Sequence, residues 1–215
     1  MRGSTATRLG RLAWHLASRS AYLPRYFLTL PIRGLSPVAL GLPWIPFPAI
    51  DFLSGWLSRK KRVFEWGCGG STLFFTARAK SVVSVEHDPA WQTRLMAATD
   101  AQGSGNLDLR IAPFDVGNAV AFEQSDYLAA VREGYWDLIM VDGVLGCGPG
   151  SEFGTHRQAC FSLAEEYVRP GGIIVVDDIW MFPEIAGTNR AISSREFVGV
   201  GPCRWGVTST AVFFY

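Results

Sequence analysis

A chain of 215 residues, 48% of them hydrophobic, can bury one domain-sized core and has room for a small extension. The formal net charge of +1 hides an asymmetry, because residues 1–50 hold six arginines and no acid, whereas residues 51–215 hold 14 basic and 19 acidic residues. An acidic body lacks the basic face that nucleic-acid binding requires, so we predict no nucleic-acid partner. The four cysteines form no C-x-x-C pair and follow no recognisable secretory signal, which predicts reduced thiols in a cytoplasmic protein.

Residues 1–48 are predicted to form a helical extension that is rich in arginine and aromatic residues. Leu9, Leu12 and Leu16 share one face of a predicted helix, and the arginines beside them can reach water. One interpretation is a helix that covers one side of the domain's ligand crevice. The other is an amphipathic helix in peripheral contact with an anionic membrane surface. An acid-poor, arginine-rich start also resembles an organelle transit peptide.

The segment over residues 38–57 is apolar for about the length of a membrane span. Three prolines and Asp51 interrupt it, and a spanning helix tolerates such breaks poorly. We therefore predict an extended, proline-rich approach to a short helix over residues 49–57 that packs on the domain. Four aromatic residues here are expected to pack rather than to enclose a substrate: Trp44, Phe47, Phe52 and Trp56.

From residue 62 onward, short apolar runs alternate with helical patterns. Strand-like runs occupy residues 62–66, 81–88, 107–115, 136–143 and 172–180. Helical patterns occupy residues 71–79, 89–100, 122–133 and 156–168, and residues 169–172 close the last of them. This alternation predicts a doubly wound α/β domain over residues 49–215 with a mostly parallel sheet. Two further β-rich runs, at 196–201 and 208–215, predict a terminal antiparallel pair.

Three glycines directly follow the first predicted strand, in the sequence EWGCGGST of residues 65–72. Gly67, Gly69 and Gly70 allow the backbone to turn sharply and to approach a ligand without side-chain collision. The helix that begins near Ser71 presents unpaired N–H groups at the same place. Glu86 ends the second strand 19 residues after Gly67, which is the spacing of an acid that accepts hydrogen bonds from ribose hydroxyls. The pattern predicts a nucleoside pocket.

The residues around this turn distinguish between two kinds of nucleoside ligand. A dinucleotide pocket usually keeps G-x-G-x-x-G, with the pyrophosphate at the helix N-terminus, whereas Thr72 replaces the third glycine here. The carboxylate of Glu65 is unfavourable beside a pyrophosphate. It favours a cationic ligand that carries an amino group and a sulfonium, such as S-adenosylmethionine.

Five motifs in this order resemble class I S-adenosylmethionine-dependent methyltransferases: EWGCGGST, VVSVEHDPAW, WDLIMVDG, RPGGIIVVDD and TSTAVFF. The first is similar to the corresponding motif of bacterial small-molecule O-methyltransferases. The resemblance implies a Rossmann-like, seven-stranded sheet of order 3-2-1-4-5-7-6 with the last strand antiparallel. The predicted cofactor-binding residues are Glu65, Gly67, Cys68, Gly69, Gly70, Ser71, Thr72, Glu86 and Asp115.

Three residues near these motifs have roles that the sequence leaves less well defined. Asp115, which ends the third strand, either meets the adenine amine or lies in a surface turn. His87 and Asp88 are expected to cap the helix that follows them.

Three acids at strand ends are predicted to converge on one crevice: Asp142 after the fourth strand, and the adjacent Asp177 and Asp178 after the fifth. Adjacent like charges at the end of a buried strand repel one another unless something neutralises them. Three oxygen ligands suit Mg²⁺, with positions left for substrate and water, and metal-dependent O-methyltransferases carry a similar set. The alternative is that one aspartate, such as Asp142, accepts a proton or hydrogen bonds without a metal.

The region after the fourth strand contains a second candidate base. His156 begins the next helix, and histidine is the default base near neutral pH, although a lone histidine at a helix start is more often structural. Arg157 is a candidate for the arginine that related sequences place soon after the Val-Asp-Gly motif. The glycine-rich residues 144–155 that precede it are interpreted as a lid.

Together these patterns predict a cytoplasmic, S-adenosylmethionine-dependent methyltransferase of bacterial type. The expected reaction is O-methylation of a small molecule, such as a sugar or a phenol, with or without Mg²⁺. Two alternatives remain open: a dinucleotide-dependent Rossmann oxidoreductase, and a non-catalytic binding protein with a relic cofactor pocket. Peripheral membrane contact is predicted only through the N-terminal extension.

Overall fold

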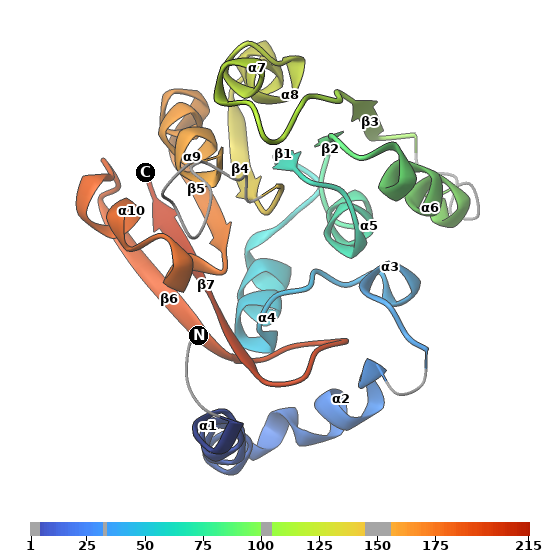
Figure 1. Cartoon of the computed structure of the whole chain (residues 1–215), viewed down its shortest axis with the longest axis vertical. Coiled ribbons are helices and arrows are strands. Elements are labelled where there is room, and N and C mark those ends of the chain that lie inside the picture. The colour runs from blue at the N-terminus through green and yellow to red at the C-terminus, as the bar shows by residue number, and fades with distance from the viewer. Residues whose placement is uncertain (1–4, 32–33, 100–104, 145–155) are drawn as a thin grey trace.

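The computed structural model describes residues 5–31, 34–99, 105–144 and 156–215. In this part of the chain, one seven-stranded sheet has the order β3-β2-β1-β4-β5-β7-β6 (Figure 1). The strands are β1 Arg62–Trp66, β2 Ser81–Glu86, β3 Leu107–Ile111, β4 Trp136–Val141, β5 Val168–Asp177, β6 Ser193–Val200 and β7 Val207–Phe214. Strands β1 to β5 pair in parallel, and β7 runs antiparallel between β5 and β6. The predicted strand order and the antiparallel last strand are confirmed.

Helices cover both faces of this sheet (Figure 1). The α-helices are α1 Thr5–Ser18, α2 Leu23–Leu28, α3 Pro37–Leu40, α4 Phe47–Trp56, α5 Gly70–Thr76, α6 Pro89–Thr99, α7 Ala119–Glu123, α8 Asp126–Ala129, α9 His156–Tyr167 and α10 Pro183–Thr188. Short 3₁₀ turns are η1 Ser20–Tyr22, η3 Ala130–Glu133 and η4 Ile179–Met181.

Each face of the sheet buries its own apolar cluster, because successive side chains of a strand point to opposite faces. In β1, Phe64 and Trp66 pack in the cluster that also holds side chains of α7, α8 and α9. Val63 belongs to the cluster on the other face, with side chains of α4 and α5. Residues Leu138 to Val141 of β4 are completely buried, which explains why the central strands read as continuous apolar runs.

The apolar segment over residues 38–57 is divided between α3 and α4, and no described helix is long and apolar enough to cross a membrane. Helix α4 begins at Phe47, two residues before the predicted start. Pro48 lies in its first turn, where the missing N–H breaks no helical hydrogen bond. The proline therefore begins the helix instead of preceding it.

Two other boundaries differ from the prediction. The helix predicted over residues 122–133 is split into α7, α8 and η3, because Ser125 accepts a hydrogen bond from the Leu128 N–H and begins a new helix. Strand β5 begins at Val168, so residues 169–172 extend the strand and do not close the preceding helix.

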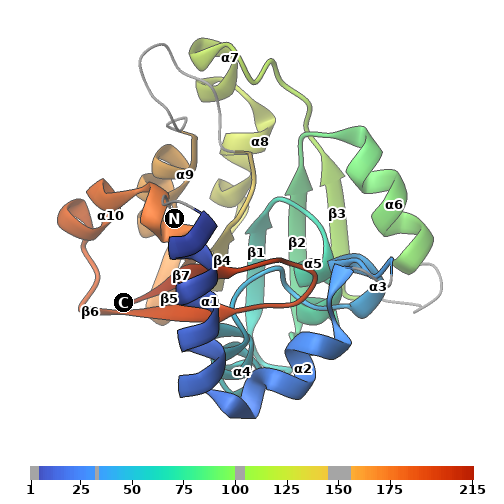
Figure 2. The same cartoon turned by 60° about the horizontal axis from the view of Figure 1, so that its bottom comes forward.

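The N-terminal extension packs on the domain (Figure 2). Helix α1 lies across β6 and β7, with Leu12 and Leu16 against the core cluster and Leu9 60% exposed. Tyr26 and Leu30 are buried in the same cluster as the side chains of α4 and α5. The described part of the extension thus shares a hydrophobic core with the sheet.

Candidate active site

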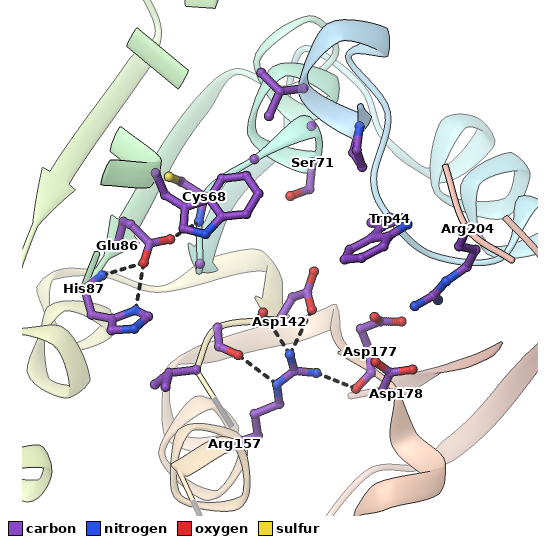
Figure 3. Close-up of a pocket in the computed structure, with 18 residues that line it drawn as sticks. Trp44, Cys68, Ser71, Glu86, His87, Asp142, Arg157, Asp177, Asp178 and Arg204 are labelled. Atoms are coloured by element: carbon purple, nitrogen blue, oxygen red, sulfur yellow. Dashed lines mark hydrogen bonds and ion pairs between the residues drawn. The ribbon is translucent and has the colours of Figure 1, made fainter. Parts of the chain in front are cut away.

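A cavity of about 360 Å³ opens at the carboxyl ends of β1, β2, β4 and β5 (Figure 3). Ligands of doubly wound sheets bind in this crevice. The N-terminal extension supplies Pro37, Val38 and Trp44 to its wall, and no described residue of α1 reaches it. The extension therefore covers one side of the crevice through the α3 region, and not through the amphipathic helix that the sequence suggested.

The glycine turn between β1 and α5 follows the path predicted for it. Gly67 has a φ of +91°, and a Cβ at this position would stand 2.9 Å from the Cα of Gly143. A Cβ on Gly70 would collide with the carbonyl oxygens of Pro37 and Leu42, so the extension can lie directly on the turn. Five residues of this turn that were predicted to bind a cofactor line the cavity: Gly67, Cys68, Gly69, Gly70 and Ser71.

Glu65 and Thr72 lie behind this turn and do not line the cavity. The Glu65 carboxylate is fully buried, and its Oε2 accepts hydrogen bonds from Thr72 Oγ1 at 2.6 Å and Ser84 Oγ at 2.8 Å. Thr72 Oγ1 also accepts a hydrogen bond from the Gly69 N–H at 2.9 Å, which connects the turn to the carboxylate. Burial raises the pKa of Glu65 to about 7, although the hydroxyl donors oppose this shift. Glu65 therefore shapes the turn from beneath, where the sequence predicted a direct cofactor contact.

Glu86 ends β2 and lines the cavity. Its Oε2 accepts a hydrogen bond from the Cys68 N–H at 2.9 Å, and its Oε1 accepts from the N–H groups of His87 at 2.8 Å and Asp88 at 2.9 Å. His87 Nδ1 lies 2.7 Å from the same Oε1 (Figure 3). Burial alone would raise the pKa of Glu86, but the His87 side chain and the backbone N–H groups hold it below its ordinary value. An ionised acceptor thus stands at the position predicted for ribose recognition.

The structure distinguishes the roles of Asp88, His87 and Asp115, which the sequence left open. Asp88 caps α6, as predicted, because its Oδ1 accepts a hydrogen bond from the Ala90 N–H at 2.9 Å. Among the described residues, the polar contacts of His87 are made to Glu86 and not to the helix start, and His87 lines the cavity beside Glu86. Asp115 is exposed, and its Oδ1 accepts from the Gly117 N–H at 3.0 Å. Of the two interpretations of Asp115, the surface turn is the one that the structure favours.

Arg157 ties the end of β4 to the end of β5. Its buried guanidinium donates from Nε to the Gly143 carbonyl at 2.9 Å, from Nη1 to the Asp177 carbonyl at 3.0 Å and from Nη2 to the Asp142 carbonyl at 3.0 Å. Nη2 also lies 3.1 Å from Asp142 Oδ1 (Figure 3). The planar guanidinium fixes both strand ends and one of the acids.

The three predicted acids all line the cavity. Asp177 is buried, and its Oδ1 accepts a hydrogen bond from Thr210 Oγ1 at 2.5 Å. Asp178 Oδ1 accepts from Thr208 Oγ1 at 2.5 Å and from Trp180 Nε1 at 3.1 Å. Asp178 also has a φ of 51°, a left-handed conformation that is uncommon outside glycine and that turns the chain sharply at the end of β5.

The surroundings raise the pKa values of two of these acids. Burial raises the pKa of Asp142 to about 6, with Arg157 opposing the shift and Asp178 adding to it. Burial, together with the neighbouring Asp142 and Asp178, raises the pKa of Asp177 well above its usual range. We therefore expect Asp142 to be largely ionised near neutral pH, and Asp177 to hold a proton more tightly than an ordinary aspartic acid does.

The predicted magnesium site does not fit this geometry. Among the residues that the structure describes, no group of three His, Cys, Asp or Glu side chains is arranged to hold a metal ion. Asp142 is paired with Arg157, and one oxygen each of Asp177 and Asp178 already accepts a hydrogen bond from a threonine.

His156, the second candidate base, does not line the cavity. Its buried ring lies 4.0 Å from the Phe122 ring and 5.8 Å from the Phe114 ring, measured between centroids. Neither ring nitrogen has a hydrogen-bond partner among the described residues, and burial lowers the pKa of His156. This packing favours the structural interpretation of the histidine. The predicted lid lies outside the described residues, apart from Val144.

Sequence reasoning missed two prominent residues of the wall. Trp44 was expected to pack, but it lines the cavity and is 46% exposed, whereas Phe47 of the same aromatic group is completely buried. Arg204 lines the cavity from the turn between β6 and β7. No spacing in the sequence connects either residue to the strand ends, because they lie near opposite ends of the chain.

Solved structures with a similar fold include proteins described as methyltransferases. A predicted O-methyltransferase from Klebsiella pneumoniae matches with a TM-score of 0.60 and 17% identity, over 97% of this chain and 98% of that one. The cofactor-bound protein Rv0187 from MTB matches with a TM-score of 0.59 and 20% identity, over 95% and 89%. The O-methyltransferase TomG from Streptomyces achromogenes, in complex with S-adenosylmethionine, matches with a TM-score of 0.53 and 14% identity, over 76% of each chain. At these identities the matches show a shared fold.

Comparison of the sequence itself identifies the family. No curated protein matches the chain. A family model described as a methyltransferase domain matches residues 64–179, which is more than half of the chain. The match runs from β1 through the acids at the end of β5. This chain therefore belongs to the methyltransferase-domain family.

Proposed function

We propose that this protein transfers a methyl group from S-adenosylmethionine to an oxygen atom of a small molecule. The observation that carries the proposal is the meeting of the glycine turn, the ionised Glu86 and the Asp142 carboxyl around one cavity at the strand ends. Membership of the methyltransferase-domain family supports methyl transfer, and the TomG complex supports S-adenosylmethionine as the donor. The likeness to O-methyltransferases supports an oxygen acceptor.

The chain's own residues suit this donor. The acceptor-only carboxylate of Glu86 can take hydrogen bonds from ribose hydroxyls, and the glycine turn leaves its backbone open to the cavity. When bound, S-adenosylmethionine would supply a methyl group on a positively charged sulfur, and in-line transfer to the acceptor oxygen breaks the carbon–sulfur bond and leaves its electron pair on sulfur. The work of the protein is to hold the acceptor oxygen in that line and to remove its proton.

Asp142 is the base that this geometry supports best. With a pKa of about 6, its carboxylate is ionised near neutral pH and basic enough to take the hydroxyl proton as the oxygen attacks. Arg157 holds the carboxylate in place at 3.1 Å. Asp177 is less suited to this role because it is buried and its Oδ1 already accepts a hydrogen bond from Thr210 Oγ1, and His156 lies outside the cavity lining.

The two alternatives are less well supported. Family membership disfavours a dinucleotide-dependent oxidoreductase. Thr72 also disfavours it, because this residue stands where a dinucleotide motif has its third glycine, and its Oγ1 accepts a hydrogen bond from the Gly69 N–H. A non-catalytic protein with a relic pocket would bind the cofactor without turnover.

The cofactor assignment is tested by calorimetric titration with S-adenosylhomocysteine and, in parallel, with NADH. Wild type should bind only the former, and Glu86→Gln should weaken its binding by about 1.5–3 kcal/mol because ribose hydroxyls lose an ionised acceptor. The exposed Glu123→Gln is the matched control and should bind as wild type does. Binding of NADH, or no binding of S-adenosylhomocysteine at millimolar concentration, would refute the proposal.

A further inference from the structure

The cavity has two chemically different ends. Glu86 and His87 stand at one end, beside the glycine turn (Figure 3). Trp44 and Arg204 stand at the other end, above Asp177 and Asp178 in the view shown. The first end carries Glu86, which is assigned to the ribose of the cofactor. The second end is therefore the part of the cavity left for the methyl acceptor.

Arg204 has hydrogen-bonding capacity that the described residues do not use. Its Nη1 is buried and has no hydrogen-bond partner among them. Its guanidinium carbon lies 5.0 Å from the centre of the Trp44 ring, which holds the group over a flat apolar surface. Arg157, by contrast, donates from all three of its nitrogens to backbone carbonyls. A buried, unpaired guanidinium N–H is unfavourable unless a ligand supplies the acceptor.

The turn that carries Arg204 is braced from the N-terminal extension. The Cys203 N–H donates to the Thr29 carbonyl at 2.9 Å, and Trp44 Nε1 donates to the Cys203 carbonyl at 3.2 Å. A Cβ on Gly201 would collide with the Ile45 carbonyl oxygen, so the turn lies directly on the extension. Arg204 is therefore presented to the cavity by a supported backbone.

We propose that Arg204 and Trp44 form the acceptor subsite, and that the methyl acceptor is a small hydroxylated carboxylic acid whose carboxylate pairs with Arg204. This inference rests on the proposed function of the cavity. A guanidinium pairs strongly with a planar carboxylate, and the Trp44 ring suits the flat or apolar body of such a molecule. A doubly charged phosphate would meet stronger repulsion from Asp142 and Asp178, which line the same cavity.

The test uses the full-length protein saturated with S-adenosylhomocysteine. The probes are hydroxybenzoates and hydroxycinnamates, each paired with its methyl ester, and binding is measured by calorimetry. The acids should bind more tightly than their esters. Arg204→Gln should weaken binding of the acids about 10- to 100-fold and remove their advantage over the esters, while Arg204→Lys should restore part of it. Arg195→Gln, the same change at an exposed arginine of β6 outside this cavity, is the matched control.

Each other outcome counts against the subsite. Esters that bind as well as acids, or a complete failure of both to bind at millimolar concentration, would overturn recognition of a carboxylate. Loss of S-adenosylhomocysteine binding in a folded Arg204→Gln variant would show that this arginine holds the cofactor instead. Failure of wild type to bind S-adenosylhomocysteine at all would sink the proposed function itself, so the two failures are distinguishable.

Discussion

The buried carboxyl of Glu65 should make the unfolding free energy of this protein depend on pH, and Glu65→Gln should remove that dependence. Its pKa is raised from 4.5 to about 7 by burial, so the folded state binds a proton more tightly than the unfolded state does. The stability linked to this proton is fully present below about pH 4.5. It is lost progressively as the pH rises to about 7.

The size of this effect follows from the shift. A change of about 2.5 pKa units, at 1.36 kcal/mol per unit, corresponds to about 3 kcal/mol of unfolding free energy across the window. Glu65→Gln keeps an oxygen that can accept from Thr72 and Ser84 but cannot ionise. Relative to wild type, the variant should therefore gain about 3 kcal/mol between about pH 4.5 and about pH 8.

Urea denaturation of both proteins over this pH range measures the difference directly. Asp142 and Asp177 also have raised pKa values, but they are present in both proteins, so their contributions largely cancel in the comparison. A difference in unfolding free energy between wild type and Glu65→Gln that stays constant with pH would refute a raised pKa at Glu65.

Three further changes test other parts of the argument. Asp142→Asn should lower the methyl-transfer rate 10²- to 10⁴-fold. It should also remove the increase in rate that the wild-type enzyme is expected to show as the pH rises past about 6. If the variant kept this increase, Asp142 would be excluded as the base. Arg157→Gln should lower the unfolding free energy by about 3–5 kcal/mol in urea, because it leaves Asp142 unpaired, whereas the exposed Arg190→Gln should have little effect. If α1 contacts membranes, the protein should float with anionic vesicles at low salt. Trp14→Ala should reduce this flotation, because it removes a side chain that is 63% exposed. Failure of the wild-type protein to float would rule out the contact.

The sheet and the cofactor side of the site could be predicted because both are encoded locally. Continuous apolar runs such as residues 138–141 mark strands buried on both faces, and the glycine turn directly follows one of them. Glu86 could be placed from its spacing alone. These features depend on residues close together in sequence, so their geometry follows from the order of the elements.

The remaining parts of the site differ in how far the sequence determines them. Glu65 was assigned to the cofactor, although strand alternation puts it on the same face as Val63, beneath α5. The alternation itself therefore predicts a buried position for Glu65. His156 was a reasonable base by residue type, but its aromatic surroundings come from α7 and the segment before it. Trp44 and Arg204 meet only after the whole sheet has formed.

The end of the cavity formed by Trp44 and Arg204 has a consequence for how the chain must fold. Trp44 and Cys203 are 159 residues apart in sequence, and the hydrogen bond from Arg19 to the Val198 carbonyl spans 179 residues. Contacts of such separation form late, because the chain must lose the entropy of closing a long loop before they stabilise it. Strand β7 also enters between two strands that precede it in the chain. During synthesis the residues of the glycine turn therefore emerge long before Cys203 and Arg204, and the Trp44 end of the cavity can close only after residue 204 has emerged.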